Sequence, residues 1–389
     1  MPPALLWLAL GTFAVGTGTF TLSGLLPPIA ADLGVGVPAA GHLILAYALT
    51  YALASPVLAA ATAGFERRRT LTLAMATYVV ASLAGAFAPN YAAVMATRIV
   101  AALAAALFVP AAGAAALALV PPPMHGRALA LVVGGLTMST VLGAPLGTLI
   151  GDRFGWRAAF VAVAILAALS AAGILLALPR LAGSRAASLR DRLSVAGRPA
   201  VLALLLQTVV TFAGAFSLFA YLAPFLQTLL GFGGQGTALG LLLSGLGGLL
   251  GVTIGGWAAD RTDPRRFLIL STAILAATVI GISLAVEGLA PATAAPVVMG
   301  LLVVMGAAGW CFPPVQQARL VALEPPLAPV LLSLNAAATY FGTSGGALVG
   351  SLVIGAGGLR ELGFAAGALA AIGALLIWRA GIGRRLALA

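Results

Sequence analysis

The sequence predicts an all-α polytopic membrane protein with twelve transmembrane helices, arranged as two pseudo-symmetric bundles of six. Three observations support this prediction. Of the 389 residues, 62% are hydrophobic and only 7% are charged, and the mean hydropathy is +1.13; about 25% charged residues is usual in soluble chains. Apolar runs long enough to cross a bilayer repeat along the chain. The basic residues gather in alternate connections between these runs.

A helix needs about 20 apolar residues to cross the hydrocarbon core of a bilayer, and twelve such runs follow one another. The expected spans are 5–26, 39–61, 70–88, 93–119, 128–150, 157–178, 200–226, 237–259, 267–286, 294–316, 328–352 and 362–380. One longer connection, 179–199, is interpreted as a linker between an N-terminal bundle (1–178) and a C-terminal bundle (200–389). We expect the first run to be a retained span, because no basic segment precedes it.

The basic residues set the expected orientation. With both termini in the cytoplasm, the inner loops, the linker and the tail hold sixteen of the 20 arginines, including Arg185 in the linker and Arg319 after the tenth span. The outer loops hold Arg153, Arg157 and Arg360. Cytoplasmic loops of membrane proteins are enriched in basic residues. We therefore expect a multi-pass protein of the inner membrane with both ends in the cytoplasm.

The composition excludes several classes of function. A net charge of +11 would suggest nucleic-acid binding in a soluble protein, but here the basic residues fit cytoplasmic loops, so no nucleic-acid partner is expected. One cysteine, Cys311, and two histidines provide neither a thiol pair nor a set of metal ligands. The sequence contains no lysine, and so no phosphate-binding loop with its Gly-Lys-Ser/Thr motif. We expect no enzyme activity, no metal and no cofactor.

The two halves carry matching features at a nearly constant distance in sequence. The matching pairs, 197 to 199 residues apart, are Leu26-Pro27 with Ala223-Pro224, Arg67-Arg68 with Arg265-Arg266, and Gly143 with Gly342. Each proline pair is expected to close the first span of its half. Parallel six-span repeats with a substrate site between them are one of the architectures of transporters, so the pattern favours a transporter.

Short motifs occur at corresponding places in the spans and loops. The loop after the eighth span reads Gly256-x-x-x-Asp260-Arg261-x-x-Pro264-Arg265-Arg266, and in its copy after the second span Ala63 replaces the Asp. The other motifs are Arg98, Gly143-Ala144-Pro145-Leu146-Gly147, Gly155-Trp156-Arg157-Ala158-Ala159-Phe160, Tyr221-x-x-Pro224-Phe225, Gly309-Trp310 with Gln316, and Asn335. In this order and spacing the set resembles the major facilitator superfamily, and most of all its bacterial drug and sugar efflux permeases of the arabinose-efflux type. The resemblance covers nearly the whole chain.

The resemblance implies the major facilitator fold and a gating role for the charged loop after the eighth span. In this interpretation an ion-pair latch holds neighbouring helices in one of two states. The latch residues are Asp260, Arg261, Arg265 and Arg266, with Arg67 and Arg68 in the degraded first copy. A second interpretation is that these partly solvated charges only fix the topology of the chain. Both interpretations stay open at this point.

Arg98 is the one arginine that the sequence places well inside a span, about 12 Å from its outer end by the helical rise. Such an arginine costs at least about 2.5 kcal/mol unless it faces a polar cavity or a partner, and snorkelling to the outer surface is the alternative. The resemblance implies a role in proton coupling. Many related exporters carry an acid in the first span, in a Gly-Thr-x-Glu-Phe-like run.

Here that run is Gly16-Thr17-Gly18-Thr19-Phe20, with Thr19 in place of the acid, and no Asp or Glu lies in the middle of any span. Coupling therefore uses a peripheral acid or His42 at the outer end of the second span, or the protein is not a proton antiporter of the usual type.

Gly143, Pro145 and Gly147 in the fifth span are typical of a close-packed helix that can bend, and the resemblance places this span at the interface between the halves. Polar and aromatic residues in the middle of spans are candidates for the wall of a substrate cavity, because amides and hydroxyls orient a neutral ligand in apolar surroundings. For the tyrosines and threonines, hydrogen bonds between helices are an equally good explanation. Gln316 and Asn335 are the strongest candidates, because an unpaired amide in the bilayer is costly. The candidates are Thr12, Thr19, Tyr47, Tyr51, Gln207, Tyr221, Gln316 and Asn335.

We therefore expect a secondary active transporter that moves a small, neutral or amphipathic molecule by alternating access, in the direction of efflux. The alternatives are a facilitator or importer of a sugar or other metabolite and, more remotely, a receptor or scaffold that transports nothing. The expected partners are a small-molecule substrate, the lipid bilayer and, as one candidate coupling ion, the proton. A monomer is expected.

Overall fold

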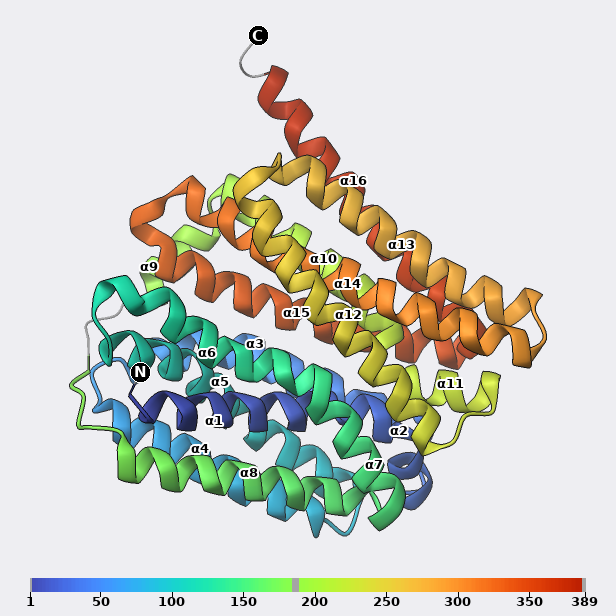
Figure 1. Ribbon diagram of the computed structural model, residues 1–389, viewed down its shortest axis with the longest axis horizontal. Coiled ribbons are helices and arrows are strands. Elements are labelled where there is room, and N and C mark those ends of the chain that lie inside the picture. Colours follow the sequence, from blue (N-terminus) through green and yellow to red (C-terminus); the bar gives the residue numbers. More distant parts are fainter. Residues whose placement is uncertain (1, 184–188, 387–389) are drawn as a thin grey trace.

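The computed structural model describes residues 2–183 and 189–386, so Arg185 of the expected linker lies outside the described residues. Over these ranges the chain is helical and contains no strand. The helices form a lower and an upper group in Figure 1, with α9 beside one end of both. We call this end the linker end, and the opposite end, where α2, α7 and α11 lie, the far end.

The first group comprises α1 to α8. Its helices are α1 (Ala4–Phe20), α2 (Leu22–Asp32), α3 (Val37–Ala61), α4 (Arg67–Ala86), α5 (Tyr91–Ala118), α6 (His125–Met138), α7 (Ala144–Phe154) and α8 (Trp156–Ala177), with a 3-10 turn, η1 (Pro122–Met124), and a π-helical turn, η2 (Ser139–Gly143).

The second group follows the short helix α9 (Leu189–Ala196). Its helices are α10 (Pro199–Phe219), α11 (Leu222–Leu230), α12 (Gly234–Arg261), α13 (Pro264–Gly288), α14 (Pro291–Leu323), α15 (Ala328–Ala356) and α16 (Leu362–Leu386), with 3-10 turns at η3 (Pro325–Leu327) and η4 (Leu359–Glu361).

Twelve spans are confirmed. Eleven segments of the described chain are long and apolar enough to cross a membrane, and α1 with α2, bent by 49°, makes the twelfth. The first span of the second half is interrupted at the corresponding place, between α10 and α11. The two halves therefore repeat even in the position of this break, as the sequence offset predicts.

Several spans extend past their predicted ends, and three of them show why. α2 runs through Pro27 and Pro28 to Asp32, and α11 runs past Pro224 to Leu230. A proline removes one backbone hydrogen bond and bends a helix, which neighbouring helices in a membrane tolerate. α14 continues to Leu323, so that Arg319 lies inside a helix and not in a loop.

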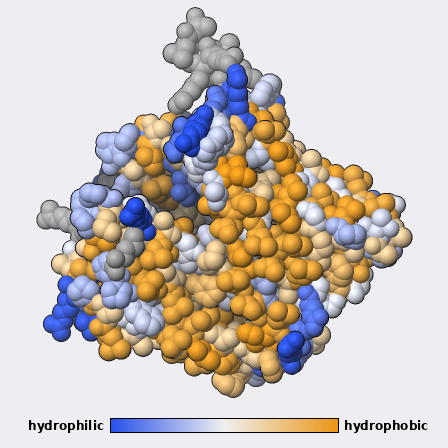
Figure 2. Space-filling model, in the orientation of Figure 1, coloured by the Kyte–Doolittle hydropathy of each residue, from blue (hydrophilic) through white to orange (hydrophobic). Residues whose placement is uncertain are grey.

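The surface of the bundle suits a lipid environment. Figure 2 shows hydrophobic residues over most of the visible face, with hydrophilic ones gathered toward its edges. Large apolar side chains point outward along the spans, among them Leu176 (85% exposed) and Val80 (66% exposed). Exposed apolar patches of this extent are not usual on soluble monomers, so this face is the one that contacts lipid.

The apolar core is continuous between the halves at the far end. One cluster of buried residues joins Leu25 and Ile29 of α2 with Tyr221 and with Phe225 of α11. At the linker end a separate cluster around α9, α10 and the start of α15 belongs to the second half alone. The halves are therefore packed together at the far end, and their cores are divided at the linker end.

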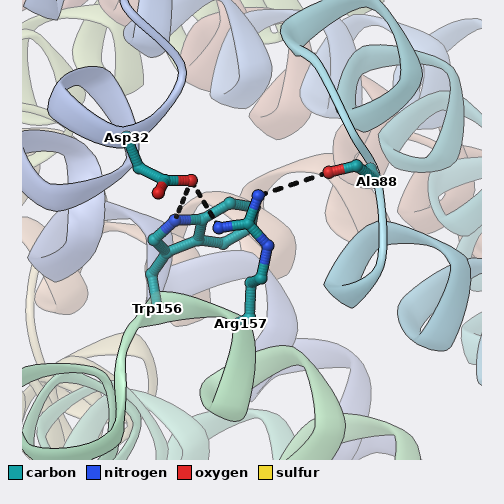
Figure 3. A network of polar contacts seen from close by, with 4 residues as sticks. All are labelled: Asp32, Ala88, Trp156 and Arg157. Atoms are coloured by element: carbon teal, nitrogen blue, oxygen red, sulfur yellow. Dashed lines mark hydrogen bonds and ion pairs between the residues drawn. The ribbon is translucent and has the colours of Figure 1, made fainter.

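A network of polar contacts closes the far end of the first half (Figure 3). Asp32, the last residue of α2, forms an ion pair with Arg157 and accepts a hydrogen bond from the Trp156 indole N–H at 3.2 Å. Arg157 also donates to the Ala88 carbonyl oxygen at 3.3 Å and lies 4.4 Å from the Trp156 ring centroid. The network connects α2, the α4–α5 loop and the start of α8.

Within the second half, glycines let α12 approach α14 closely. A Cβ atom on Gly247, Gly251 or Gly255 would overlap a backbone carbonyl oxygen of α14. Small residues at such spacing allow direct packing of helix backbones in a membrane. We expect the replacement Gly251→Ala to force the two helices apart and to destabilise the protein by about 1–3 kcal/mol, as overpacking does.

Thermal unfolding in detergent measures this effect. Gly300→Ala is the matched control, since Gly300 lies on α14 of the same helix pair and a Cβ there would meet nothing within 4 Å. An unfolding midpoint of Gly251→Ala equal to that of Gly300→Ala would contradict the close approach.

Candidate functional site

A cavity bordered mainly by aromatic residues lies between the two halves. Its empty space, counted together with the open region at its mouth, is about 480 Å³. Its wall consists of Phe20 from α1 and residues of α10, α12 and α14. These are Thr211, Phe212, Ala215, Phe216, Phe219, Ser244, Met305, Gly306, Gly309 and Trp310. Both halves thus contribute to the cavity.

The aromatic rings of the wall contact one another in a connected series. Phe20 lies 6.3 Å from Phe216 and 6.2 Å from Phe219 by ring centroids, and so crosses from the first half to the second. Phe212 stacks on Phe216 at 6.0 Å and meets Trp310 edge to face at 6.4 Å. These are the separations at which aromatic pairs attract. Aromatic faces and edges therefore dominate the wall.

The cavity lies near the middle of the membrane. Phe212 is the fourteenth of the 32 residues of the first span of the second half, Pro199–Leu230. Its wall contains no charged residue, and its hydroxyl groups are those of Thr211 and Ser244. The chemistry of this wall suits a ring system or another apolar body with few hydrogen-bonding groups.

Sequence reasoning did not single out these residues for a cavity. Phenylalanine in a span usually faces the core or the lipid, and nothing in its chemistry marks a phenylalanine that lines a cavity. One signal was present in the spacing of Phe212, Phe216 and Phe219, which places the three rings on one face of a helix. The sequence marks Trp310 only as part of the Gly309-Trp310 motif.

None of the eight residues predicted for the cavity wall lines this cavity. In the first half, the Thr12 hydroxyl donates to the Val132 carbonyl oxygen at 2.6 Å and so joins α1 to α6, while the Thr19 hydroxyl donates to its own helix. Tyr51 stacks on Tyr340 of the other half, with ring centroids 3.7 Å apart. Tyr51 thus belongs to the contact between α3 and α15.

The predicted residues of the second half also make contacts between helices. The Tyr221 hydroxyl donates to the Ala347 carbonyl oxygen at 2.8 Å, and Asn335 accepts a hydrogen bond from Thr208 at 2.8 Å. Gln316 donates to the Leu204 carbonyl oxygen at 2.7 Å. These side chains are buried, and they hold α10, α14 and α15 together.

Arg319 completes this polar network and was missed because the sequence places it in a loop. Its Nη1 donates to the side-chain oxygen of Gln207 at 3.0 Å and to that of Gln316 at 2.8 Å. A long side chain in the last turns of a spanning helix can reach back to buried acceptors. The two buried amides are the signal that could have located it, because their oxygens need donors.

Arg98 is 4% exposed, in the second turn of α5. Its guanidinium carbon lies 4.3 Å from the ring centroid of Tyr47 and 5.9 Å from that of Phe160. Arg98 is therefore inside the bundle and does not snorkel to the surface. Among the described residues no carboxylate forms an ion pair with it.

The loop after α12 does not form the expected latch in this structure. Asp260 is exposed, and its carboxylate forms no ion pair with any described residue. Asp263 instead caps α13 by accepting from the Arg266 backbone N–H at 2.8 Å, and Arg265 donates to carbonyl oxygens of Ile377 and Trp378 on α16. Arg261 lies 5.8 Å from the Trp257 ring centroid.

In the degraded first copy of this loop, the chain contacts the linker. The backbone N–H of Arg67 donates to the Leu181 carbonyl oxygen at 2.9 Å. A Cβ on Gly183 would overlap the backbone of Ala63 and Gly64. Arg68 is half-buried beside them. The loop is thus fixed by backbone contacts with the segment that follows α8.

The glycine and proline cluster of the fifth span changes its hydrogen-bond pattern. The π-helical turn η2 ends at Gly143, just before Pro145, which has no N–H to continue an α-helical ladder. A Cβ on Gly143 or Gly147 would overlap the Thr17 or Thr21 side chain of the first span. This irregular turn also packs against α12 of the other half.

Comparison with known proteins agrees with this architecture. Residues 8–294 match the family Major Facilitator Superfamily. The chain is 38% identical over 279 residues to the Chloramphenicol resistance protein of Streptomyces lividans, covering 71% of each sequence. It is 32% identical over 356 residues to the inner membrane transport protein YdhP of Escherichia coli K12, covering 91% of this chain and 89% of that protein.

Solved structures show the same fold. The crystal structure of a D-xylose-proton symporter superposes with a TM-score of 0.80, covering 96% of each chain at 16% identity. The chain belongs to the major facilitator superfamily of membrane transporters, as its motifs predict.

The Arg319 network supplies a test of the polar core of the second half. Replacing Arg319 by Met removes the donor to two buried amide oxygens, so we expect a loss of about 1–2 kcal/mol in the free energy of unfolding. The unfolding midpoint in detergent measures it. Arg69→Met is the control, because Arg69 is exposed. Equal midpoints for the two variants would show that the network adds nothing to stability.

Proposed function

We propose that this protein exports a small, uncharged or amphipathic molecule with an aromatic or otherwise apolar body. The observation that carries the proposal is the uncharged cavity between the halves, with its series of aromatic rings from Phe20 to Trp310. Stacking and edge-to-face contacts bind ring systems. A substrate site between two six-helix repeats is the arrangement by which such transporters expose one site to either side in turn.

The same cavity argues against a sugar as the substrate. A sugar presents many hydroxyl groups, and each one that loses water without gaining a partner costs free energy. Thr211 and Ser244 are the hydroxyl-bearing residues of the wall. The alternative of a sugar importer or facilitator therefore has less support than efflux of an apolar compound.

Export as the direction has two supports. The Streptomyces relative is named for resistance to chloramphenicol, and it shares 38% of residues over 71% of this chain. The linker end carries most of the arginines, so the positive-inside rule assigns it, with both termini, to the cytoplasm. The halves are packed together at the opposite end, which leaves the cavity to be entered from the cytoplasmic side.

The two loops at the cytoplasmic end are proposed to act unequally in the conformational cycle. Asp260 forms no ion pair among the described residues in this state and is available to pair with an arginine when the halves close at this end. Gly143, Pro145 and Gly147 would give the fifth span the pliability that such a movement needs. Arg98 is the proposed coupling residue, and the protein is proposed to work as a monomer in the inner membrane.

A transport assay tests whether the aromatic cavity is the substrate site. Replacing Phe216 by Ala removes the ring that contacts Phe20, Phe212 and Phe219. We expect at least roughly a tenfold loss in the rate of chloramphenicol uptake into everted vesicles, where export appears as uptake; this is the kinetic equivalent of about 1.4 kcal/mol. Phe154→Ala is the control, because Phe154 is 74% exposed at the far end.

Export that is unchanged in Phe216→Ala at equal expression would remove this cavity as the substrate site. Absence of export in the wild-type protein, for chloramphenicol and for a panel of uncharged aromatic compounds, would instead overturn the proposed substrate class.

The latch is tested by charge removal. Asp260→Asn keeps the shape of the side chain and removes its charge, so we expect slower export at normal expression, because the state closed at the cytoplasmic end loses an ion pair. Asp263→Asn is the control, since Asn also caps helix N-termini well and Asp263 serves as a cap. Export by Asp260→Asn at the wild-type rate would leave the topological role as the function of this loop.

A further inference from the structure

Arg98 is a buried cation whose charge the protein does not compensate. The residue is 4% exposed, and its Nε–H has no hydrogen-bond acceptor among the described residues. The two ion pairs of the described chain join Asp32 to Arg157 and Glu324 to Arg198. A guanidinium inside a membrane domain requires a partner or a polar cavity.

Asp32, an acid whose partner Trp156 contacts Phe160, is already engaged. Arg98 lies over Phe160, which is one helical turn from Trp156 and contacts its ring edge to face at 5.4 Å. Trp156 and Arg157 both bind the Asp32 carboxylate (Figure 3). The carboxylate therefore serves the far-end network and leaves Arg98 unpaired.

The tyrosine ring next to Arg98 stabilises the positive charge of the guanidinium but cannot neutralise it. The guanidinium carbon lies 4.3 Å from the Tyr47 ring centroid. The face of an aromatic ring attracts a cation, but phenols are uncharged near neutral pH. An anion from outside the chain would supply the missing negative charge.

A small cavity next to Arg98 has room for a small anion. The cavity is lined by Arg98, by the hydroxyl-bearing residues Thr21 and Ser82, and by Gly18 and Phe160 among others. It holds about one particle the size of a water molecule. It shares no lining residue with the aromatic cavity.

We propose that this cavity binds one monatomic inorganic anion, chloride under ordinary conditions. The anion would lie against the Arg98 guanidinium, accept a hydrogen bond from a donor such as the Ser82 hydroxyl, and compensate the buried charge. Its binding site belongs to the first half alone, and its existence does not depend on which substrate the protein exports. A water molecule is the competing occupant.

Direct binding of radioactive chloride to the purified protein tests the proposal. Equilibrium dialysis in detergent, at constant ionic strength set with gluconate so that surface screening does not change, is expected to show saturable uptake of one chloride per chain. Bromide is expected to compete and gluconate is not. Chloride should also raise the thermal unfolding midpoint until the site is filled, because a ligand of the folded state stabilises it.

Three variants test whether the ion binds next to Arg98. We expect Arg98→Gln to lose saturable binding, Ser82→Ala to weaken it several-fold, and Arg153→Gln, an exposed arginine at the far end, to bind as the wild type does. Absence of saturable chloride uptake by the wild-type protein overturns the proposal and leaves water as the occupant. Binding that survives in both Arg98→Gln and Ser82→Ala overturns it by placing the ion elsewhere. If Arg98→Gln does not fold, Ser82→Ala with the wild type decides the outcome.

Discussion

A polar group inside a bilayer costs free energy unless it finds a partner, and this constraint governs the structure. It requires backbone hydrogen bonds to close within each span, which explains why the described chain is helical. It also acts on side chains. Thr19 and Ser217 return their hydroxyls to their own helices, while Gln316 and Tyr221 donate to backbone carbonyls of neighbouring helices.

The same constraint limits what the sequence can reveal about a substrate site. Twelve spans follow from runs of apolar residues, because the thickness of the membrane fixes their length. The rules used for their ends are local, and tertiary contacts override them. Pro27 lies inside α2 and does not end it. Arg319 lies within α14, because its guanidinium donates hydrogen bonds to two buried amide oxygens.

For the site, family motifs located Arg98 and Trp310, while most of the polar residues predicted for a cavity wall make contacts between helices in this structure. The cavity instead uses phenylalanines. A phenylalanine that faces a cavity and one that faces lipid are identical in sequence, and only the position of the partner helix separates them. Phe20 illustrates the point, since it acquires its role through Phe216 and Phe219 of the other half.

The two halves have similar folds, but the charged residues at their linker ends differ. Both first spans break at the same relative position, at Thr21 and near Tyr221. At the linker end the halves differ, because Asp260 has no counterpart at Ala63, where the chain contacts the linker through Leu181 and Gly183. The charged contacts that could change during a cycle are therefore concentrated in one half.

The structure separates the place where an apolar molecule fits from the place where a charge is buried. The aromatic cavity is uncharged, so an uncharged substrate moving through it carries no charge across the membrane. Arg98 lies in the first half against Tyr47 of α3. One helical turn further along α3, Tyr51 stacks on Tyr340 of α15. The environment of the buried charge is thus one turn from the contact at which the two halves meet, and a change in the compensation of Arg98 has a short physical route to that interface.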